Sequence, residues 1–91
     1  MIYSVYIVQC ADGSLYTGIA IDVARRVAEH NGEKCRGARY TSARRPVTLV
    51  YQAPCGTRAD ACRQEARIKR LTRGQKLTLI DAVSVRETEP A

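Results

Sequence analysis

Two short hydrophobic runs open the chain and predict a β-hairpin. Residues 2–10 (IYSVYIVQC) are rich in β-branched and aromatic side chains, and residues 15–19 (LYTGI) form a second run of the same kind. The four residues between them, ADGS, are typical of a tight turn.

The length of the hairpin loop decides which side chains share a face of the sheet. A two-residue Asp12-Gly13 loop would place Tyr6 and Tyr16 on opposite faces. A three-residue loop over 11–13, with Gly13 in the left-handed region, would place both tyrosines on one face as diagonal neighbours. The sequence leaves both arrangements open.

The rest of the pattern predicts alternating helices and one more strand. In chain order we expect a helix over 23–34 capped by Asp22, a surface loop over 35–46 carrying Tyr40, a strand over 47–52 ended by Pro54-Cys55-Gly56, a helix over 58–72 capped by Thr57, and a helix over 75–83. This order predicts an α+β fold, a three-stranded antiparallel sheet flanked by helices. We expect one domain over 1–83 and a flexible tail over 84–91.

Composition narrows the class of protein. No stretch of the 91 residues approaches the ~18 to 20 consecutive apolar residues of a membrane span, and the start lacks the basic segment of a signal peptide. We therefore expect a cytoplasmic protein. The spacing of the four cysteines matches neither a zinc-finger pairing nor a CxxC redox motif, so we interpret them as small packing residues.

The net charge of +6 lies mainly in the middle of the chain. Residues 22–50 carry +4 and residues 58–76 carry +5, whereas 1–21 and 77–91 are acidic. Arginine supplies 12 of the 15 positive side chains, and its planar fork suits phosphate. A polyanionic partner is one interpretation; solvated helix faces that keep the protein soluble are the other.

Five polar side chains form a candidate site. Tyr6 and Tyr16 lie in the two strands of the hairpin, and Arg26 and His30, four residues apart, project from one side of a helix. Glu65 falls on the apolar side of the next helix, where a carboxylate needs a partner. Each has an ordinary alternative: tyrosines pack in strands, Arg26 and His30 are surface residues, and Glu65 pairs with a lysine one turn on.

Together these residue types suit hydrolysis of a phosphodiester. In-line attack by water needs a cation for the developing charge, a carboxylate for a divalent ion, and a base for the water. Arg26, Glu65 and a tyrosine meet these needs, and His30 could accept the proton of the tyrosine. Gly18 would also allow close approach to the backbone of the second strand.

The ordered series of motifs resembles the GIY-YIG nuclease superfamily, and in particular its small stand-alone bacterial members. The residues that carry the resemblance are Val5-Tyr6-Ile7, Tyr16-Thr17-Gly18, Arg25-Arg26, His30-Asn31, Tyr40-Thr41, Arg44-Arg45-Pro46 and the segment 61–69 around Glu65. The likeness covers about residues 1–83.

The resemblance implies DNA cleavage that depends on one divalent ion, Mg²⁺ or Mn²⁺, in repair, recombination or turnover. It implies that Tyr6 and Tyr16 are the signature tyrosines, that Arg26 binds phosphate, that His30 is the helix residue of the site, and that Glu65 is the metal ligand. The chain departs from the family pattern in both motifs, which read Ser4-Val5-Tyr6, without the first glycine, and Tyr16-Thr17-Gly18. It also has Ile19 where several relatives have a lysine and Lys76 where many have an asparagine.

We expect the substrate to be held by basic side chains rather than by a second domain. The candidate nucleic-acid contacts are Arg25, Arg39, Arg44, Arg45, Arg63, Arg67 and Lys69. Phosphate contacts carry no sequence information, so we expect weak sequence preference and selection of shape, such as branched, nicked or single-stranded DNA, with RNA left open. The alternatives are a nucleic-acid-binding module whose catalysis is lost or needs a partner protein, and a purely structural protein.

Overall fold

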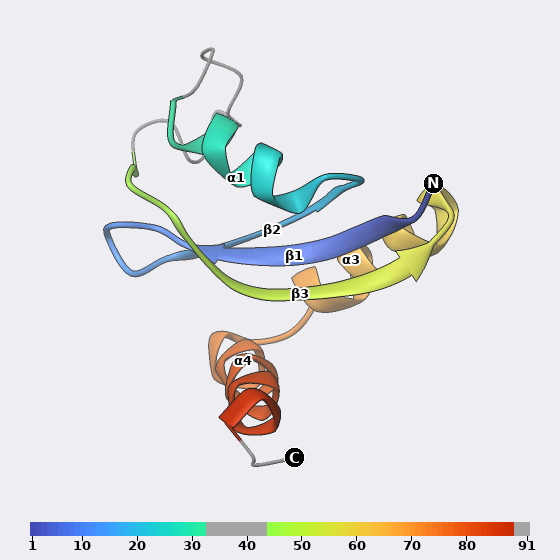
Figure 1. Cartoon of the computed structure of the whole chain (residues 1–91). Helices are drawn as coiled ribbons and strands as arrows, with labels where there is room; N and C mark the ends of the chain where they lie inside the picture. Colours follow the sequence, from blue (N-terminus) through green and yellow to red (C-terminus); the bar gives the residue numbers. More distant parts are fainter. Residues whose placement is uncertain (33–43, 89–91) are drawn as a thin grey trace.

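The chain forms one antiparallel sheet covered by helices, as the hydrophobic pattern predicts (Figure 1). The computed structural model describes the backbone of residues 1–32 and 44–88, and side chains in these ranges up to residue 82. The described elements are β1 (Tyr3–Gln9), β2 (Leu15–Ala20), α1 (Val23–His30), β3 (Thr48–Gly56), α3 (Arg58–Lys69) and α4 (Arg73–Thr88). The strand order β2-β1-β3 confirms the α+β fold class. Most of the expected loop over 35–46, with Arg39 and Tyr40, lies outside the described residues.

The register of the hairpin settles the question of the loop length. Tyr6 pairs with Gly18, and the backbone N–H of Cys10 donates to the carbonyl of Ser14 at 2.8 Å. Gly13 has φ 85°, in the left-handed region that a three-residue loop requires. The three-residue loop is therefore confirmed, and Tyr6 and Tyr16 lie on one face of the sheet.

β3 is longer than its sequence suggests. The strand pairs with β1 as far as Gly56, so the expectation that Pro54-Cys55-Gly56 ends it is wrong. The reason is the position of β3 at an edge of the sheet. Proline lacks a backbone N–H, and an edge strand tolerates it because one side of the strand has no hydrogen-bonding neighbour.

Capping residues fix where α1 and α3 begin. The carboxylate of Asp22 accepts a hydrogen bond from the backbone N–H of Arg25 at 3.1 Å, which confirms Asp22 as the N-cap of α1. Thr57 and Asp60 form a reciprocal capping box at the start of α3. α3 ends at Lys69, earlier than expected. α1 ends at His30 with Asn31 as its C-cap, so Asn31-Gly32 end the helix before residue 34.

α4 begins earlier and ends later than expected. Thr72 and Gln75 exchange side-chain and backbone hydrogen bonds at 2.9 and 3.2 Å, a second capping arrangement before the helix starts at Arg73. The helix continues to Thr88, so residues 84–88 are helical and the expected tail from 84 is wrong over that stretch. The domain boundary at 83 stays a prediction.

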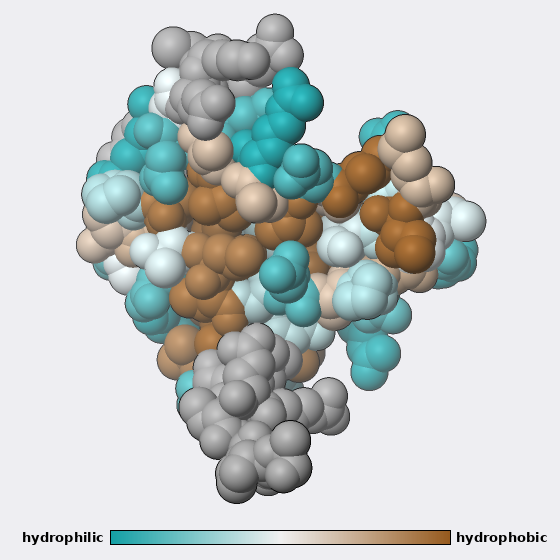
Figure 2. All heavy atoms as spheres, in the orientation of Figure 1, coloured by the Kyte–Doolittle hydropathy of each residue, from teal (hydrophilic) through white to brown (hydrophobic). Residues whose placement is uncertain are grey.

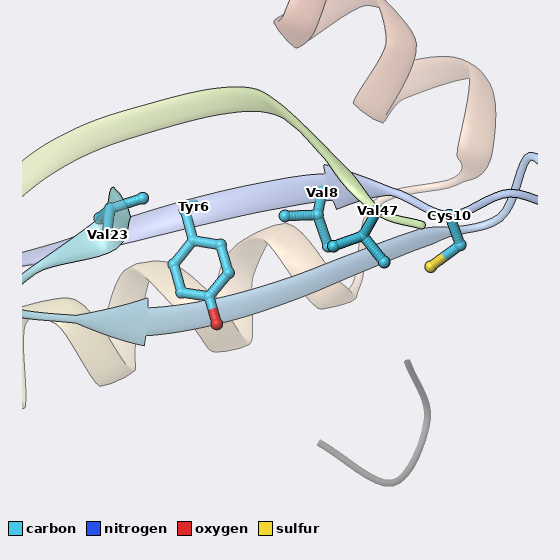
Figure 3. Close-up of a cluster of buried hydrophobic side chains, with 5 residues drawn as sticks. All are labelled: Tyr6, Val8, Cys10, Val23 and Val47. Atoms are coloured by element: carbon cyan, nitrogen blue, oxygen red, sulfur yellow. The ribbon is translucent and has the colours of Figure 1, made fainter. Parts of the chain in front are cut away.

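The sheet buries a separate hydrophobic cluster on each face because side chains alternate along β1. Val5 and Ile7 pack with Ile68 of α3 on one face. Tyr6 and Val8 pack on the other face with Val23 of α1 and with Cys10 and Val47, the cluster drawn in Figure 3. The central strand is thereby covered on both sides, by α1 above and α3 below in Figure 1.

Part of the hydrophobic surface remains exposed. Figure 2 shows brown side chains gathered over the middle of one face, surrounded by hydrophilic residues. Of the described cysteines, Cys10 is buried, Cys55 is half-buried and Cys62 is exposed, all as free thiols. The packing role expected for the cysteines therefore fits Cys10 and is wrong for Cys62. Within the described ranges, no helix has the length and apolar character needed to cross a membrane.

Candidate active site

The hydroxyl end of the Tyr6 side chain lies close to the backbone of Gly18. A Cβ placed on Gly18 would come within 2.6 Å of the Tyr6 hydroxyl and 2.8 Å of its Cζ atom, far inside van der Waals contact. The aromatic side chain therefore reaches from the central strand across β2 toward the outer edge of the sheet. The sequence analysis expected a close approach at Gly18 and did not identify Tyr6 as the group that makes it.

His30 holds the hydroxyl of Tyr6 inside the protein. The Tyr6 oxygen and His30 Nε2 are 2.7 Å apart, and the two side chains are 1% and 0% exposed. The half-buried ring of Tyr16 meets the His30 ring nearly edge-on, with centroids 5.2 Å apart. Three of the five predicted site residues thus form one aromatic cluster beneath α1.

Two contacts fix the end of α1, where His30 lies. Arg45 Nε donates to the carbonyl oxygen of His30 at 2.9 Å. The side chain of Asn31 donates to the carbonyl of Val47 at 3.0 Å and accepts from its backbone N–H at 2.6 Å. Asn31 therefore pairs with Val47 much as a neighbouring strand would. In the sequence, Asn31-Gly32 indicates an early end of the helix and gives no sign that Asn31 pairs with Val47.

Arg26 extends from the middle of α1 toward Tyr6. Its Nη1 atom donates to Glu29 Oε1 at 3.0 Å, and its guanidinium also hydrogen-bonds the Tyr6 side chain. Glu29 lies 3.7 Å from Arg25 as well, so one carboxylate orients both arginines. Sequence reasoning missed Glu29, although its spacing of three and four residues from the two arginines is the signal for such pairs.

Burial sets the ionisation of the Tyr6 and His30 pair. Burial, reinforced by the nearby Tyr16, raises the pKa of Tyr6 to about 12, against a smaller lowering by Arg26. Burial and the positive charge of Arg26 lower the pKa of His30 to about 4. Both side chains are therefore neutral at pH 7, and the hydrogen bond between them joins two neutral groups.

Glu65 approaches the same site from the opposite face of the sheet. Ala61 and Ile68 turn toward the strands, and Gln64 and Glu65 flank that buried line on its two sides. Gln64 lines a cavity against β3, so Glu65 faces the β2 edge. Burial is the main reason that the pKa of Tyr6 is raised, and the negative charge of Glu65 adds a smaller contribution in the same direction.

The surroundings of Glu65 suit a metal ion that is shared with a substrate. Its side chain is one quarter exposed and pairs with Lys69 at 3.7 Å, the ordinary alternative considered above. In the described part of the chain no three histidine, cysteine or acidic side chains come together as a ready-made metal site. Mg²⁺ commonly uses one or two carboxylates together with waters and substrate phosphates, and a lone, partly exposed Glu65 fits that mode.

The predicted nucleic-acid contacts fall on two sides of the molecule. Arg25 and Arg45 lie at α1, and Arg44 binds Asp12 of the hairpin loop at 3.1 Å. Lys69 lies beside Glu65, whereas Arg63 and Arg67 line cavities on the β3 flank of α3. Arg39 is outside the described residues.

Two of the departures from the family pattern, Ile19 and Lys76, lie away from the aromatic cluster. Ile19 packs with the hydrophobic cluster on the α3 face of the sheet. Lys76 lies in the first turns of α4, where it is half-buried. Neither position adds a polar group to the Tyr6 and His30 pair.

Comparisons with known proteins agree with this geometry. The family model described as the GIY-YIG catalytic domain matches residues 2–78. UPF0213 protein DP2720 of Desulfotalea psychrophila is 55% identical over 78 residues, covering 86% of this chain and 70% of its own. UPF0213 protein SERP0126 of Staphylococcus epidermidis is 57% identical over 76 residues, covering 84% of this chain and 90% of its own.

Solved structures extend the likeness to the fold. The solution NMR structure of the UPF0213 protein BH0048 from Bacillus halodurans has a TM-score of 0.57 at 39% identity, covering 90% of this chain and 85% of its own. The solution NMR structure of the protein EF2693 from E. faecalis has a TM-score of 0.59 at 32% identity, covering 100% and 92%. The signature tyrosines, the ordered motifs and the three-stranded fold agree with these matches, and the chain belongs to the GIY-YIG catalytic domain family, a family of nucleases.

Proposed function

We propose that the protein is an endonuclease that hydrolyses phosphodiester bonds of DNA with the help of one divalent metal ion. The observation that carries the proposal is that Arg26 and His30 of α1 contact the buried hydroxyl of Tyr6, and that the charge of Glu65 on α3 acts on the same hydroxyl. A tyrosine that only packs in a sheet does not require a glycine beside its hydroxyl, a buried imidazole bonded to that hydroxyl, or the charge of a nearby carboxylate.

Arg26 supplies the positive charge in this proposal. Its side chain is 30% exposed, so a phosphate can reach it, and Glu29 and Tyr6 already orient the guanidinium. An arginine held in this way stabilises the negative charge that develops on the phosphoryl oxygens in the transition state. The phosphate would share the guanidinium with Glu29.

Tyr16 is the better candidate for the group that meets the attacking water. Tyr6 is 1% exposed and its burial favours the protonated hydroxyl, so water cannot easily approach it as a base. Tyr16 is half-buried, and the edge of one ring meets the face of the other in its contact with His30. We therefore assign Tyr6 and His30 a positioning role and Tyr16 the contact with water.

Glu65 is the residue that would hold Mg²⁺ or Mn²⁺. When bound, the ion polarises the phosphoryl group and stabilises the leaving oxygen. Glu65 would exchange its ion pair with Lys69 for the metal, and Lys69 would then be available for a phosphate. We propose a cytoplasmic role in DNA repair, recombination or turnover, with weak sequence preference.

The test is cleavage of labelled duplex and flap DNA with Mg²⁺ or Mn²⁺ by the protein and by Glu65→Gln. The substitution keeps the size and hydrogen-bonding capacity of the side chain and removes the charge that a metal ligand needs. We expect cleavage by the native sequence, abolition by chelation, and a loss of at least ~100-fold in Glu65→Gln. Cleavage that persists in Glu65→Gln contradicts the proposal.

A second candidate is a nucleic-acid-binding module whose catalysis is lost or needs a partner protein. Arg26 forms an ion pair with Glu29, and Glu65 forms one with Lys69. Both ion pairs must break before Arg26 can bind phosphate and Glu65 can bind a metal ion, and this requirement favours the second candidate. In this case the protein binds DNA or RNA in a salt-sensitive manner and cleaves neither with any metal. Arg44 and Arg45 would then matter more for binding than Glu65.

A further inference from the structure

The outer face of α3 carries a row of arginines that the proposed active site does not use. Arg63, Arg67 and Arg70 follow one another at spacings of four and three residues, so they lie on one exposed face of the helix. Among the described residues, Arg67 and Arg70 have no carboxylate partner, and Arg63 pairs only with Asp60. Successive side chains are about 6 Å apart along the helix, and the row is concentrated positive charge.

A trough runs beside this row, between α3 and the strand β3. Two cavities of about 280 and 300 Å³ share Tyr51 and Gln64. The first includes Arg63 and extends to Pro54 at the end of β3, and the second includes Arg67. The shared residues join the two cavities into one site. Arg63 and Arg67 lie on one side of it, and Asp60, the ion-pair partner of Arg63, lines the first cavity as well.

The chemistry of the trough fits an unpaired nucleic-acid strand. Tyr51, half-buried on β3, offers a ring on which a base can stack, and the Gln64 amide can donate to and accept from a base edge. Arg63 and Arg67 on one side suit phosphates. Each cavity has about the volume of a small ligand site, which suits an unpaired base or a phosphate of a single strand.

The trough and the proposed active site lie on opposite flanks of α3. Gln64 lines the trough, and its neighbour Glu65 faces the β2 edge. A strand in the trough therefore lies across α3 from Glu65 and on the opposite face of the sheet from Arg26. A substrate that fills both must have two arms that diverge.

We propose that the trough formed by Tyr51, Gln64, Arg63 and Arg67 is a second nucleic-acid site that holds the unpaired strand of a branched DNA. The inference rests on the proposed function, because the other arm of the branch occupies the site at the β2 edge. It names the substrate class of that site: a duplex with a single-stranded flap, rather than plain duplex.

The test compares binding of labelled oligo-dT and of blunt duplex at several salt concentrations. We expect Arg63→Ala combined with Arg67→Ala to weaken oligo-dT binding at least tenfold and to reduce the salt slope by about 1.4, the loss of two single-strand phosphate contacts. The control is Arg58→Ala, which removes one positive charge from the Glu65 flank of the same helix and should leave oligo-dT binding unchanged, whereas Arg67→Ala alone, which also removes one charge, should weaken it.

A second pair of variants tests the stacking surface and guards against misfolding. Tyr51→Phe keeps the ring and should bind oligo-dT as the native protein does, whereas Tyr51→Leu should weaken binding at least about fivefold. Thermal unfolding of each variant confirms that it is folded. Oligo-dT binding that is unchanged in the double arginine variant, or lost equally for blunt duplex, overturns the proposal.

The proposal and the endonuclease function fail in different ways. If the native protein cleaves flap DNA and the double arginine variant cleaves it equally fast, the trough has no role and the endonuclease function stands. If no DNA is cleaved under any condition, the oligo-dT measurements still decide whether the trough binds a strand. We expect the double variant to cleave flap DNA no faster than blunt duplex.

Discussion

At the scale of single residues, the site depends on one close contact and one buried hydrogen bond. Gly18 leaves room for the ring of Tyr6, and His30 fixes the hydroxyl of that ring at 2.7 Å. The sequence could predict which residue types assemble, because the spacing of Arg26 and His30 is that of one helix face. It could not predict the burial of Tyr6 and His30, because burial depends on how α1 packs on the sheet.

Gly18→Ala should disturb the site by steric conflict. The added methyl group would lie 2.6 Å from the Tyr6 hydroxyl, and the ring, 1% exposed, has little space in which to move. We expect a loss of about 1 to 3 kcal/mol in the free energy of unfolding. Gly74→Ala is the matched control, because the nearest atom is 4.0 Å away and alanine favours the helix by about 0.5 to 1 kcal/mol. Equal stability of the two variants in urea titrations would show that Tyr6 does not need this glycine.

The buried imidazole should make stability depend on pH in the acidic range. The pKa of His30 is about 4 in the folded protein and 6.5 in an unfolded chain, because burial opposes the charged form. As the pH falls from 6.5 to 4, the unfolded chain binds a proton that the folded protein does not, and stability decreases by up to about 3 kcal/mol. Asp12 and Asp60, whose pKa values are lowered, titrate below this range.

Urea unfolding at a series of pH values, for the native sequence and for His30→Gln, measures this effect. Glutamine can still hydrogen-bond Tyr6 and does not titrate. We expect the slope between pH 6.5 and 4 to disappear in His30→Gln. The same slope in both proteins would assign the acid sensitivity to other groups.

At the scale of elements, the sequence indicated every described strand and helix and misjudged several ends. The hydrophobic pattern does not show where α1 and α3 end. Pro54 predicts the end of β3, but the strand continues because it lies at an edge of the sheet, and the sequence does not show which strand is at the edge. The sequence allows a two-residue or a three-residue hairpin loop, and the backbone angle φ of 85° at Gly13 identifies the three-residue loop. The start of α4 can be predicted from the sequence, because Thr72 and Gln75 have the spacing of a capping box.

Asn31 should join the end of α1 to the start of β3. Asn31→Ala removes both bonds to Val47 and leaves the partly buried backbone groups of Val47 without a partner, so we expect a loss of about 1 to 3 kcal/mol. Asn31→Asp keeps the hydrogen-bond acceptor and loses the donor, so its free energy of unfolding should lie between those of the native protein and Asn31→Ala. Hydrogen exchange of the Val47 amide is the direct readout, and unchanged protection in Asn31→Ala would contradict this role.

At the scale of the whole molecule, α3 separates the two sites that we propose. The β2 flank brings Glu65 toward Arg26 and Tyr6, and the β3 flank carries Arg63 and Arg67. The longest extent of the described structure is 38 Å, close to one turn of duplex at about 34 Å. A molecule of this size contacts few phosphates, so its substrate preference rests on the shape of the DNA.

The central claim is that Arg26 acts in the transition state of phosphodiester hydrolysis. The most direct measurement is the single-turnover rate of flap cleavage with Mg²⁺ at saturating protein, with DNA affinity measured in parallel, for the native sequence and for Arg26→Ala. We expect the rate to fall at least ~100-fold while affinity falls less than ~10-fold, because the guanidinium is needed most when charge develops on the phosphoryl group. An unchanged rate, or a loss of affinity that accounts for the whole loss of rate, would contradict the claim.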